Sequence, residues 1–438
     1  MLALAHPAAA GAFRIGFFDG EFTAARAQRD PRLDEARAAG ASIVRLNAGW
    51  PAARMPQSPA DPADPAYAFG ALDNAVRAAS ERGLRIVLSF TGAPRWAEGP
   101  GRPRSAPRGS WRPDPEAVGA YGEALARRYS GAFGDPARPG STLPRVAAFQ
   151  LWNEPNLSKY LSPQWRRSGR RAVPVAPGHY RQMLNAFYAG VHRAQPRATV
   201  VTGGTAPFGD PGAGMRMPPA RFVRELLRRP VRFDVLAHHP YSVGGPFRHA
   251  LNADDVSLPD LGKLLRPLRA AQRAGRALPR GPKRLWITEV SWDSRPPDPD
   301  GVPAMVHARW LAEALYVLWR QGADTVLWFQ VRDQAPRPSY AATSQSGILR
   351  RDGRPKPARR AFSFPFVARR GRDGRVGAWT LAPAGGTLAI ERRAGRGWQV
   401  LSSGTVARGQ ISLRRIAVPH GARLRARVGD AVSLTATA

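Results

Sequence analysis

Short apolar runs alternate with amphipathic stretches along most of the chain. Runs of this length are typical of strands buried on both faces, and the stretches between them carry apolar residues at helical spacing. Strand–helix alternation predicts a parallel sheet covered by helices. Eight pairs occur, with strands expected at 13–18, 42–47, 84–90, 146–153, 199–203, 233–239, 284–289 and 324–330, and helices expected at 31–40, 69–82, 115–129, 178–194, 219–229, 258–274, 303–321 and 356–362.

The number of pairs separates two kinds of α/β fold. Eight pairs, with no Gly-x-Gly-x-x-Gly motif after the first strand, favour a closed barrel over an open doubly wound sheet. We therefore predict an α/β protein with a (β/α)8 TIM barrel over residues 13–364. After about Pro365 the pattern changes to short alternating segments between Gly-rich turns, which predicts a small all-β, sandwich-like domain over 365–438.

The first twelve residues are apolar and end in small side chains. They resemble the end of a secretory signal peptide, with Ala8-Ala9-Ala10 as the cleavage-like site, although a positive segment before them is missing. The alternative is a disordered Ala-rich start. We expect a secreted, extracellular protein, and no apolar run is long enough to predict a membrane span.

The formal net charge of +34 changes the picture less than its size suggests. Lysine occurs at only four positions, so arginine carries nearly all of the charge, and arginine is enriched together with Ala, Gly and Pro, as in a biased composition. Basic residues are also spread along the chain rather than clustered. We expect no nucleic-acid partner, while an anionic glycan or cell wall is a possible neighbour. The absence of cysteine excludes a disulfide framework, thiolate metal sites and a cysteine nucleophile.

Two glutamates stand out by position. The fourth expected strand runs into Asn153-Glu154-Pro155, and Pro155 cannot continue a strand ladder. The seventh ends at Glu289. Strands four and seven lie on opposite sides of an eight-stranded barrel, so the two carboxylates should face each other across its mouth. Such a pair suits cleavage of a glycosidic bond, where one carboxyl group is protonated and the other ionised.

Asn153-Glu154-Pro155 after the fourth strand, with a glutamate ending the seventh, resembles the clan A retaining glycoside hydrolases. The closest resemblance is to bacterial enzymes of family 39 or family 5. It implies that Glu154 is the acid/base, that Glu289 is the nucleophile and that Asn153 binds the 2-hydroxyl of the sugar. It also implies that Arg45 lies beneath the nucleophile and keeps it ionised. Trp328 matches the tryptophan that floors the sugar site, with a core aromatic as the alternative.

The sixth strand leads into His238-His239-Pro240-Tyr241. His239 and Tyr241 match a family 39 pattern and are expected to contact the nucleophile or the substrate. The side chain of His238 should point to the opposite side of the strand, so we expect His238 to be a packed structural histidine. A His-His pair could suggest a metal, but the sequence offers no third ligand, so we expect neither a metal nor a cofactor. The third strand lacks a histidine that some clan members carry, which leaves the sugar undefined.

We therefore expect a glycoside hydrolase that cleaves O-glycosidic bonds of a poly- or oligosaccharide by double displacement. Its two carboxyl groups should be separated by about 5–5.5 Å. The alternatives are a transglycosylase on the same scaffold and a non-catalytic carbohydrate- or polyanion-binding protein. The linkage, endo or exo action and the oligomeric state are not predicted.

Overall fold

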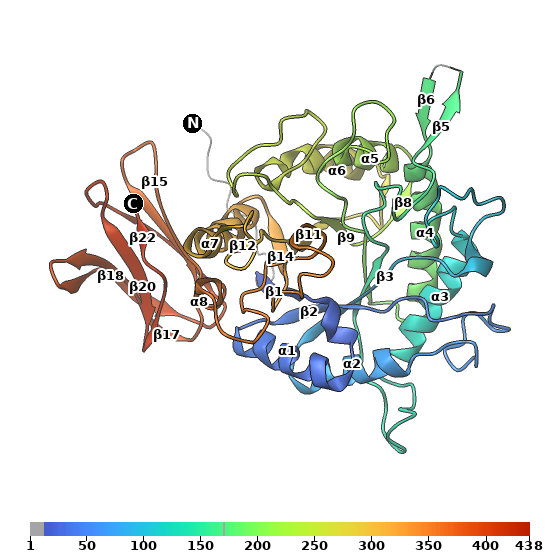
Figure 1. Cartoon of the computed structure of the whole chain (residues 1–438), viewed down its shortest axis with the longest axis horizontal. Coiled ribbons are helices and arrows are strands. Elements are labelled where there is room, and N and C mark those ends of the chain that lie inside the picture. Colours follow the sequence, from blue (N-terminus) through green and yellow to red (C-terminus); the bar gives the residue numbers. More distant parts are fainter. Residues whose placement is uncertain (1–12, 170) are drawn as a thin grey trace.

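The predicted strands close into a barrel in which every neighbouring pair is parallel (Figure 1). The computed structural model describes residues 13–169 and 171–438, so the expected signal-peptide end at 1–12 lies outside the described residues. In barrel order, the strands are β1 (Arg14–Phe18), β14 (Ala323–Phe329), β11 (Arg284–Val290), β9 (Val235–His238), β7 (Thr199–Val201), β4 (Ala148–Leu151), β3 (Arg85–Phe90) and β2 (Ile43–Asn47).

Helices surround the barrel as predicted, with shifted ends. The first helix begins at Arg26 rather than at Pro31, because Pro31 lies inside the helix and does not mark its start. The sixth is split into a 3-10 turn, Leu258–Asp260, and a helix that starts at Gly262. The α-helices are α1 (Arg26–Ala38), α2 (Gly70–Glu81), α3 (Pro115–Arg128), α4 (Ala176–Ala194), α5 (Pro219–Leu226), α6 (Gly262–Arg273), α7 (Ala304–Arg320) and α8 (Pro357–Ser363).

A plug of apolar side chains fills the barrel interior. It is a cluster separate from the one beneath the helices, and it consists of Ile43, Val87, Ala148, Val201, Val235, Ala237, Trp286 and Leu327. Side chains two residues apart on a strand point to the same side. The next interior layer toward the carboxyl ends of the strands therefore comes from positions two residues further on. That layer is mostly polar and includes Arg45, Ser89, Gln150, His239 and Thr288.

Several short strands lie outside the barrel. The sequence did not predict the hairpin of β5 (Trp165–Ser168) and β6 (Arg171–Pro174), which lies between β4 and α4 and projects from the molecule (Figure 1). Two further pairs are formed by β8 (Val231–Arg232) with β10 (Ala277–Leu278), and by β12 (Ser294–Arg295) with β13 (Val302–Pro303).

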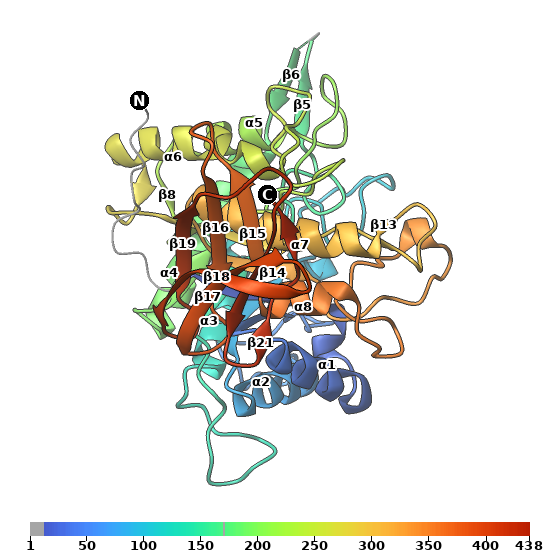
Figure 2. The same cartoon turned by 90° about the vertical axis from the view of Figure 1, so that its left-hand side faces the viewer.

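The C-terminal part is an antiparallel β domain beside α7 and α8 (Figure 2), which confirms the predicted fold class. Trp379 is fully buried, and its ring lies 5.6 Å from that of Tyr316 and 5.9 Å from that of Trp319, both on α7. The domain therefore shares core with the barrel. One sheet contains β15 (Phe366–Arg370), β16 (Val376–Leu381) and β19 (Ile411–Ile416), and the other β17 (Gly386–Ala394), β18 (Gly397–Val406), β20 (Arg423–Val428), β21 (Ala431–Val432) and β22 (Ala436–Thr437).

The barrel closes where its first strand pairs with its last. Gly16 of β1 lies in register with Leu327 of β14. Beyond these strands, the buried carboxylate of Asp19 accepts a hydrogen bond from the backbone N–H of Val331 at 3.1 Å. Among the described residues, no helix combines the length and the apolar character that crossing a membrane requires.

Candidate active site

The chain leaves β4 through a strained turn that aims Glu154 into the barrel mouth. Trp152 and Glu154 have φ angles of 71° and 37°, in the left-handed region that side chains other than glycine rarely adopt. The backbone N–H of Glu154 donates to the carbonyl of Gly204 at 3.0 Å. The fully buried side-chain amide of Asn156 donates to the carbonyl of Ala206 and accepts from the backbone N–H of Ala206, which holds the chain in place after Glu154. Strain of this kind concentrates at functional sites.

Glu289 lies at the end of β11, and two side chains from other parts of the barrel hold its carboxylate. The register with β14 shifts between Ile287 and Val290, which turns the glutamate toward the mouth. Arg45 Nη1 donates to Glu289 Oε1 at 2.6 Å, and the Tyr241 hydroxyl donates to Oε2 at 3.1 Å. Burial alone would raise the pKa of Glu289, but the guanidinium of Arg45 and the hydrogen bond from Tyr241 hold this pKa below its ordinary value of 4.5.

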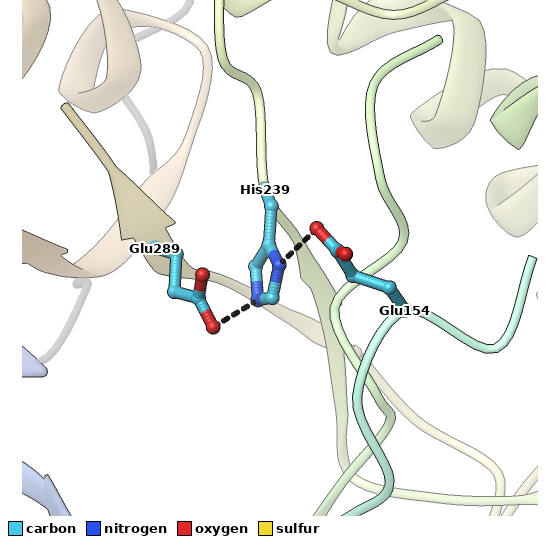
Figure 3. A group of neighbouring side chains, drawn as sticks. All are labelled: Glu154, His239 and Glu289. Atoms are coloured by element: carbon cyan, nitrogen blue, oxygen red, sulfur yellow. Dashed lines mark hydrogen bonds and ion pairs between the residues drawn. The ribbon is translucent and has the colours of Figure 1, made fainter. Parts of the chain in front are cut away.

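The imidazole of His239 lies between the two carboxylates (Figure 3). Its Nδ1 is 3.1 Å from Glu154 Oε1, and its Nε2 is 3.7 Å from Glu289 Oε1. One oxygen of Glu154 lies within 4.8 Å of one oxygen of Glu289. The structure therefore brings together the facing pair of carboxylates that the sequence predicts, with His239 as the bridge.

Three further residues singled out from the sequence, Arg45, Asn153 and His238, have defined contacts in the structure. Arg45 reaches across the interior from β2, and its Nη2 donates to Asn153 Oδ1 at 3.1 Å. The amide nitrogen of Asn153 forms no hydrogen bond within the described part of the chain, so it is free to donate to a ligand. His238 is a structural histidine, as expected: its ring nitrogens contact Thr205 and the carbonyl of Val256, and burial lowers its pKa to about 3.

Trp328 is placed differently from a sugar platform. It has the opposite parity to the interior residue Leu327, so its indole points toward α7 and packs against Trp292 and His307. Only 1% of its surface is exposed, and its N–H donates to the carbonyl of Ser346. This placement fits the core-aromatic alternative. The half-buried aromatic pair on the interior side is Phe329 with Phe18, whose ring centroids are 5.5 Å apart.

Glu154, His239 and Glu289 offer three atoms close enough to hold a metal ion. The sequence analysis considered a metal only at the pair His238-His239, but His238 is not part of this group, which joins His239 to the two glutamates instead. Yet both ring nitrogens of His239 already have hydrogen-bonding partners, and the Arg45 guanidinium occupies the cation position beside Glu289. These contacts already occupy the ring nitrogens of His239 and the charge of Glu289, which disfavours a cation at this site.

Sequence reasoning missed the polar layer beneath these residues. Ser89 accepts from Arg45 Nε at 2.9 Å, and Gln150 donates to Thr288 Oγ1 at 3.1 Å. Thr288 in turn lies 2.9 Å from His239 Nε2. The sequence does carry a signal for this layer. Each of these polar residues interrupts an apolar run, two positions after a small or apolar residue that faces the barrel interior.

The same fold occurs in solved glycoside hydrolases. A family 39 glycoside hydrolase from the gut symbiont Bacteroides cellulosilyticus WH2 matches with a TM-score of 0.55 at 17% identity, over 92% of this chain and 81% of that one. A glucosidase from Croceicoccus marinus matches with a TM-score of 0.54 at 16% identity, over 93% and 94% of the two chains. This confirms at the level of the fold the resemblance predicted from the motifs. No family model and no curated protein matches the sequence.

Proposed function

We propose that this protein is a retaining glycoside hydrolase that cleaves O-glycosidic bonds of a poly- or oligosaccharide by double displacement. The observation that carries the proposal is the short approach of Glu154 to Glu289, within 4.8 Å between oxygens, in two unlike environments. Retaining enzymes separate their carboxyl groups by about 5–5.5 Å, whereas inverting enzymes need about 6.5–9.5 Å to admit a water. A glycoside substrate also fits the fold shared with a glucosidase and a family 39 enzyme.

In the first step, Glu289 attacks the anomeric carbon while Glu154 protonates the departing glycosidic oxygen. The ion pair with Arg45 keeps Glu289 ionised, as a nucleophile must be. Glu154 has no arginine or lysine partner within the described residues, so no permanent cation opposes its protonation. The Asn153 amide nitrogen can donate to the sugar hydroxyl next to the reacting carbon, where hydrogen bonds strengthen in the transition state.

In the second step, Glu154, now ionised, removes a proton from water as the water attacks the anomeric carbon. The bond from the sugar to Glu289 breaks, and Glu289 returns to its ion pair with Arg45. Two successive inversions give net retention of configuration. Tyr241 donates to the second oxygen of Glu289 and fixes the plane of the carboxylate in both steps.

The test is a screen of the purified protein against plant, microbial and cell-wall glycans, followed by NMR of the first anomer released. We expect hydrolysis with retention, loss of turnover in Glu289→Ala, and rescue of Glu154→Ala by azide with a retained glycosyl azide as product. Glu116→Ala, an exposed glutamate on α3, is the matched control. Inversion, or near-normal turnover of Glu289→Ala, would contradict the proposal.

The alternatives from the sequence lead to different outcomes of the same screen. A transglycosylase would transfer the sugar to an added acceptor in preference to water, and a carbohydrate-binding protein would retain glycans without cleaving them. A polyanion-binding protein would lose affinity steeply with salt and would not respond to Glu289→Ala. Secretion and an association with an anionic glycan stay predictions from the sequence.

A further inference from the structure

A chain of buried polar side chains runs from the barrel interior to Glu154. It begins at Gln150 on β4, crosses to Thr288 on β11, continues to His239 after β9, and ends at Glu154. Gln150, Thr288 and the His239 side chain are fully buried. Residues on or directly after three strands thus form one hydrogen-bonded path. Of its members, Glu154 alone takes part in the proposed reaction.

The direction of each bond follows from counting donors and acceptors. Gln150 Nε2 lies 3.0 Å from the carbonyl oxygen of Thr202, which can only accept, so this atom is the amide nitrogen. Its second hydrogen goes to Thr288 Oγ1 at 3.1 Å. The Thr288 hydroxyl therefore accepts from Gln150 and has one proton of its own to donate.

Within the described ranges 13–169 and 171–438, Thr288 Oγ1 has one further hydrogen-bonding partner, His239 Nε2 at 2.9 Å. If Nε2 carried a proton, the buried hydroxyl hydrogen of Thr288 would have no acceptor, and leaving a buried donor unpaired costs about 1–3 kcal/mol. Nε2 is consequently the acceptor, and the proton of a neutral His239 ring lies on Nδ1.

We propose, building on the function above, that Gln150 and Thr288 are positioning residues that fix His239 as the Nδ1–H tautomer and thereby place the acid proton of Glu154 on Oε2. His239 Nδ1–H donates to Glu154 Oε1. The proton of Glu154 is then excluded from that oxygen and occupies Oε2, which makes no hydrogen bond with a described residue. In the opposite tautomer, Nδ1 would accept the proton of Glu154 and compete with the glycosidic oxygen for it.

The surroundings hold the ring in this position. A Cβ on Gly204 would approach His239 Nε2 to 2.2 Å, so the ring occupies space that only a glycine leaves open. The charged or titratable groups that face it are Glu154, Glu289 and, behind Glu289, Arg45 and Tyr241.

The tautomer can be read without any substrate. Long-range 1H–15N correlation spectra of the histidine-labelled protein, with His239 assigned by its loss in His239→Asn, should show a neutral ring protonated at Nδ1. Thr288→Val should convert the ring to Nε2–H or to a mixture of tautomers, whereas Thr288→Ser, which keeps the hydroxyl, should leave it as Nδ1–H. An Nε2–H ring or an imidazolium in the unaltered protein at pH 7 would overturn the assignment, even if Thr288→Val failed to fold.

A kinetic arm links the tautomer to the acid proton. With the sugar identified by the glycan screen, Thr288→Val should cleave the phenyl glycoside about 10–100 times more slowly, because this leaving group needs the acid. The 2,4-dinitrophenyl glycoside needs no proton, so the rate of forming the glycosyl-enzyme from it should change by less than about twofold. Equal losses on both glycosides would mean a merely structural role. Glu289→Ala, inactive on both, tests the proposed function separately.

Discussion

Arg45 and Glu289 form a buried ion pair across the interior, with Arg45 Nη1 2.6 Å from Glu289 Oε1 and only 3% of the arginine side chain exposed. Its consequence is a carboxylate whose pKa lies below 4.5 in spite of burial, which by itself raises that pKa. In the proposed function the ionised form of Glu289 is the nucleophile, so the acidic limb of kcat/KM that Glu289 contributes should lie below pH 4.5.

Arg45→Gln removes the cation and leaves Glu289 buried. The pKa of Glu289 should then rise, so that on acidification kcat/KM begins to fall at a higher pH than in the wild type. At pH 7, kcat/KM should fall by about 100-fold or more. Arg45→Lys should restore part of the shift, and Arg266→Gln, on the exposed side of α6, should leave the profile unchanged. An unmoved acidic limb in Arg45→Gln would contradict this role.

Phe329 rather than Trp328 should bear the sugar. Phe329 lies on the interior side and stacks on Phe18, whereas the Trp328 indole is covered. We expect Phe329→Ala to raise KM by about tenfold, or about 1.4 kcal/mol of binding, with a smaller effect on kcat. Phe133→Ala, beyond the far end of α3, should leave KM unchanged. A normal KM in Phe329→Ala would exclude the ring as a platform.

Gly204→Ala tests the space for the bridging histidine. The new methyl group would lie 2.2–2.9 Å from ring atoms of His239, so the ring must move away from Glu154. We expect a loss of kcat/KM of about 100-fold in a protein that still folds. Gly262→Ala, where nothing lies within 4 Å, is the control and should keep full activity. A crystal structure of Gly204→Ala with His239 in its original position would contradict this prediction, because it would mean that other atoms move to make room for the methyl group.

Asp293 should make the protein less stable as the pH rises. Burial raises the pKa of Asp293 to about 6, above its ordinary value of 3.8. Between these values the folded state binds more protons than the unfolded state, so this contribution is fully present below pH 3.8 and is lost as the pH rises through 6. Relative to Asp293→Asn, the wild type should lose about 2–3 kcal/mol of unfolding free energy between pH 4 and pH 7. Parallel urea-unfolding curves for the two proteins across this range would contradict the shift.

The sequence predicts the parts of this molecule that depend on burial and on chain direction. All eight barrel strands are apolar runs, and Glu154 and Glu289 stand where two of those runs end, so their meeting follows from closing the barrel. Arg45 could be placed beneath Glu289 through the resemblance to the clan A glycoside hydrolases, and the structure pairs the two residues. The small β domain follows from the change in periodicity near residue 365.

Other features depend on information that an apolar run does not contain. A strand buried on both faces shows no alternation, so the sequence could not indicate that Trp328 faces α7 while Phe329 faces the interior. Gln150 and Thr288 were missed because each is a single polar residue among apolar neighbours, and their common layer becomes visible only when the strands are placed side by side in the barrel. The left-handed backbone at Trp152 and Glu154 runs against local preference, and Glu154 is held there by a hydrogen bond from its N–H to the carbonyl of Gly204, which is distant in the sequence.

The pairing of Gly16 with Leu327 also bears on how the protein is made. During synthesis β1 emerges first, yet one of its two edges stays without a partner until almost the whole barrel sequence has left the ribosome. An unpaired apolar edge can recruit a strand from another chain. The barrel should therefore be most prone to aggregate just before β14 appears, and a pause in translation downstream of residue 331 would lower that hazard.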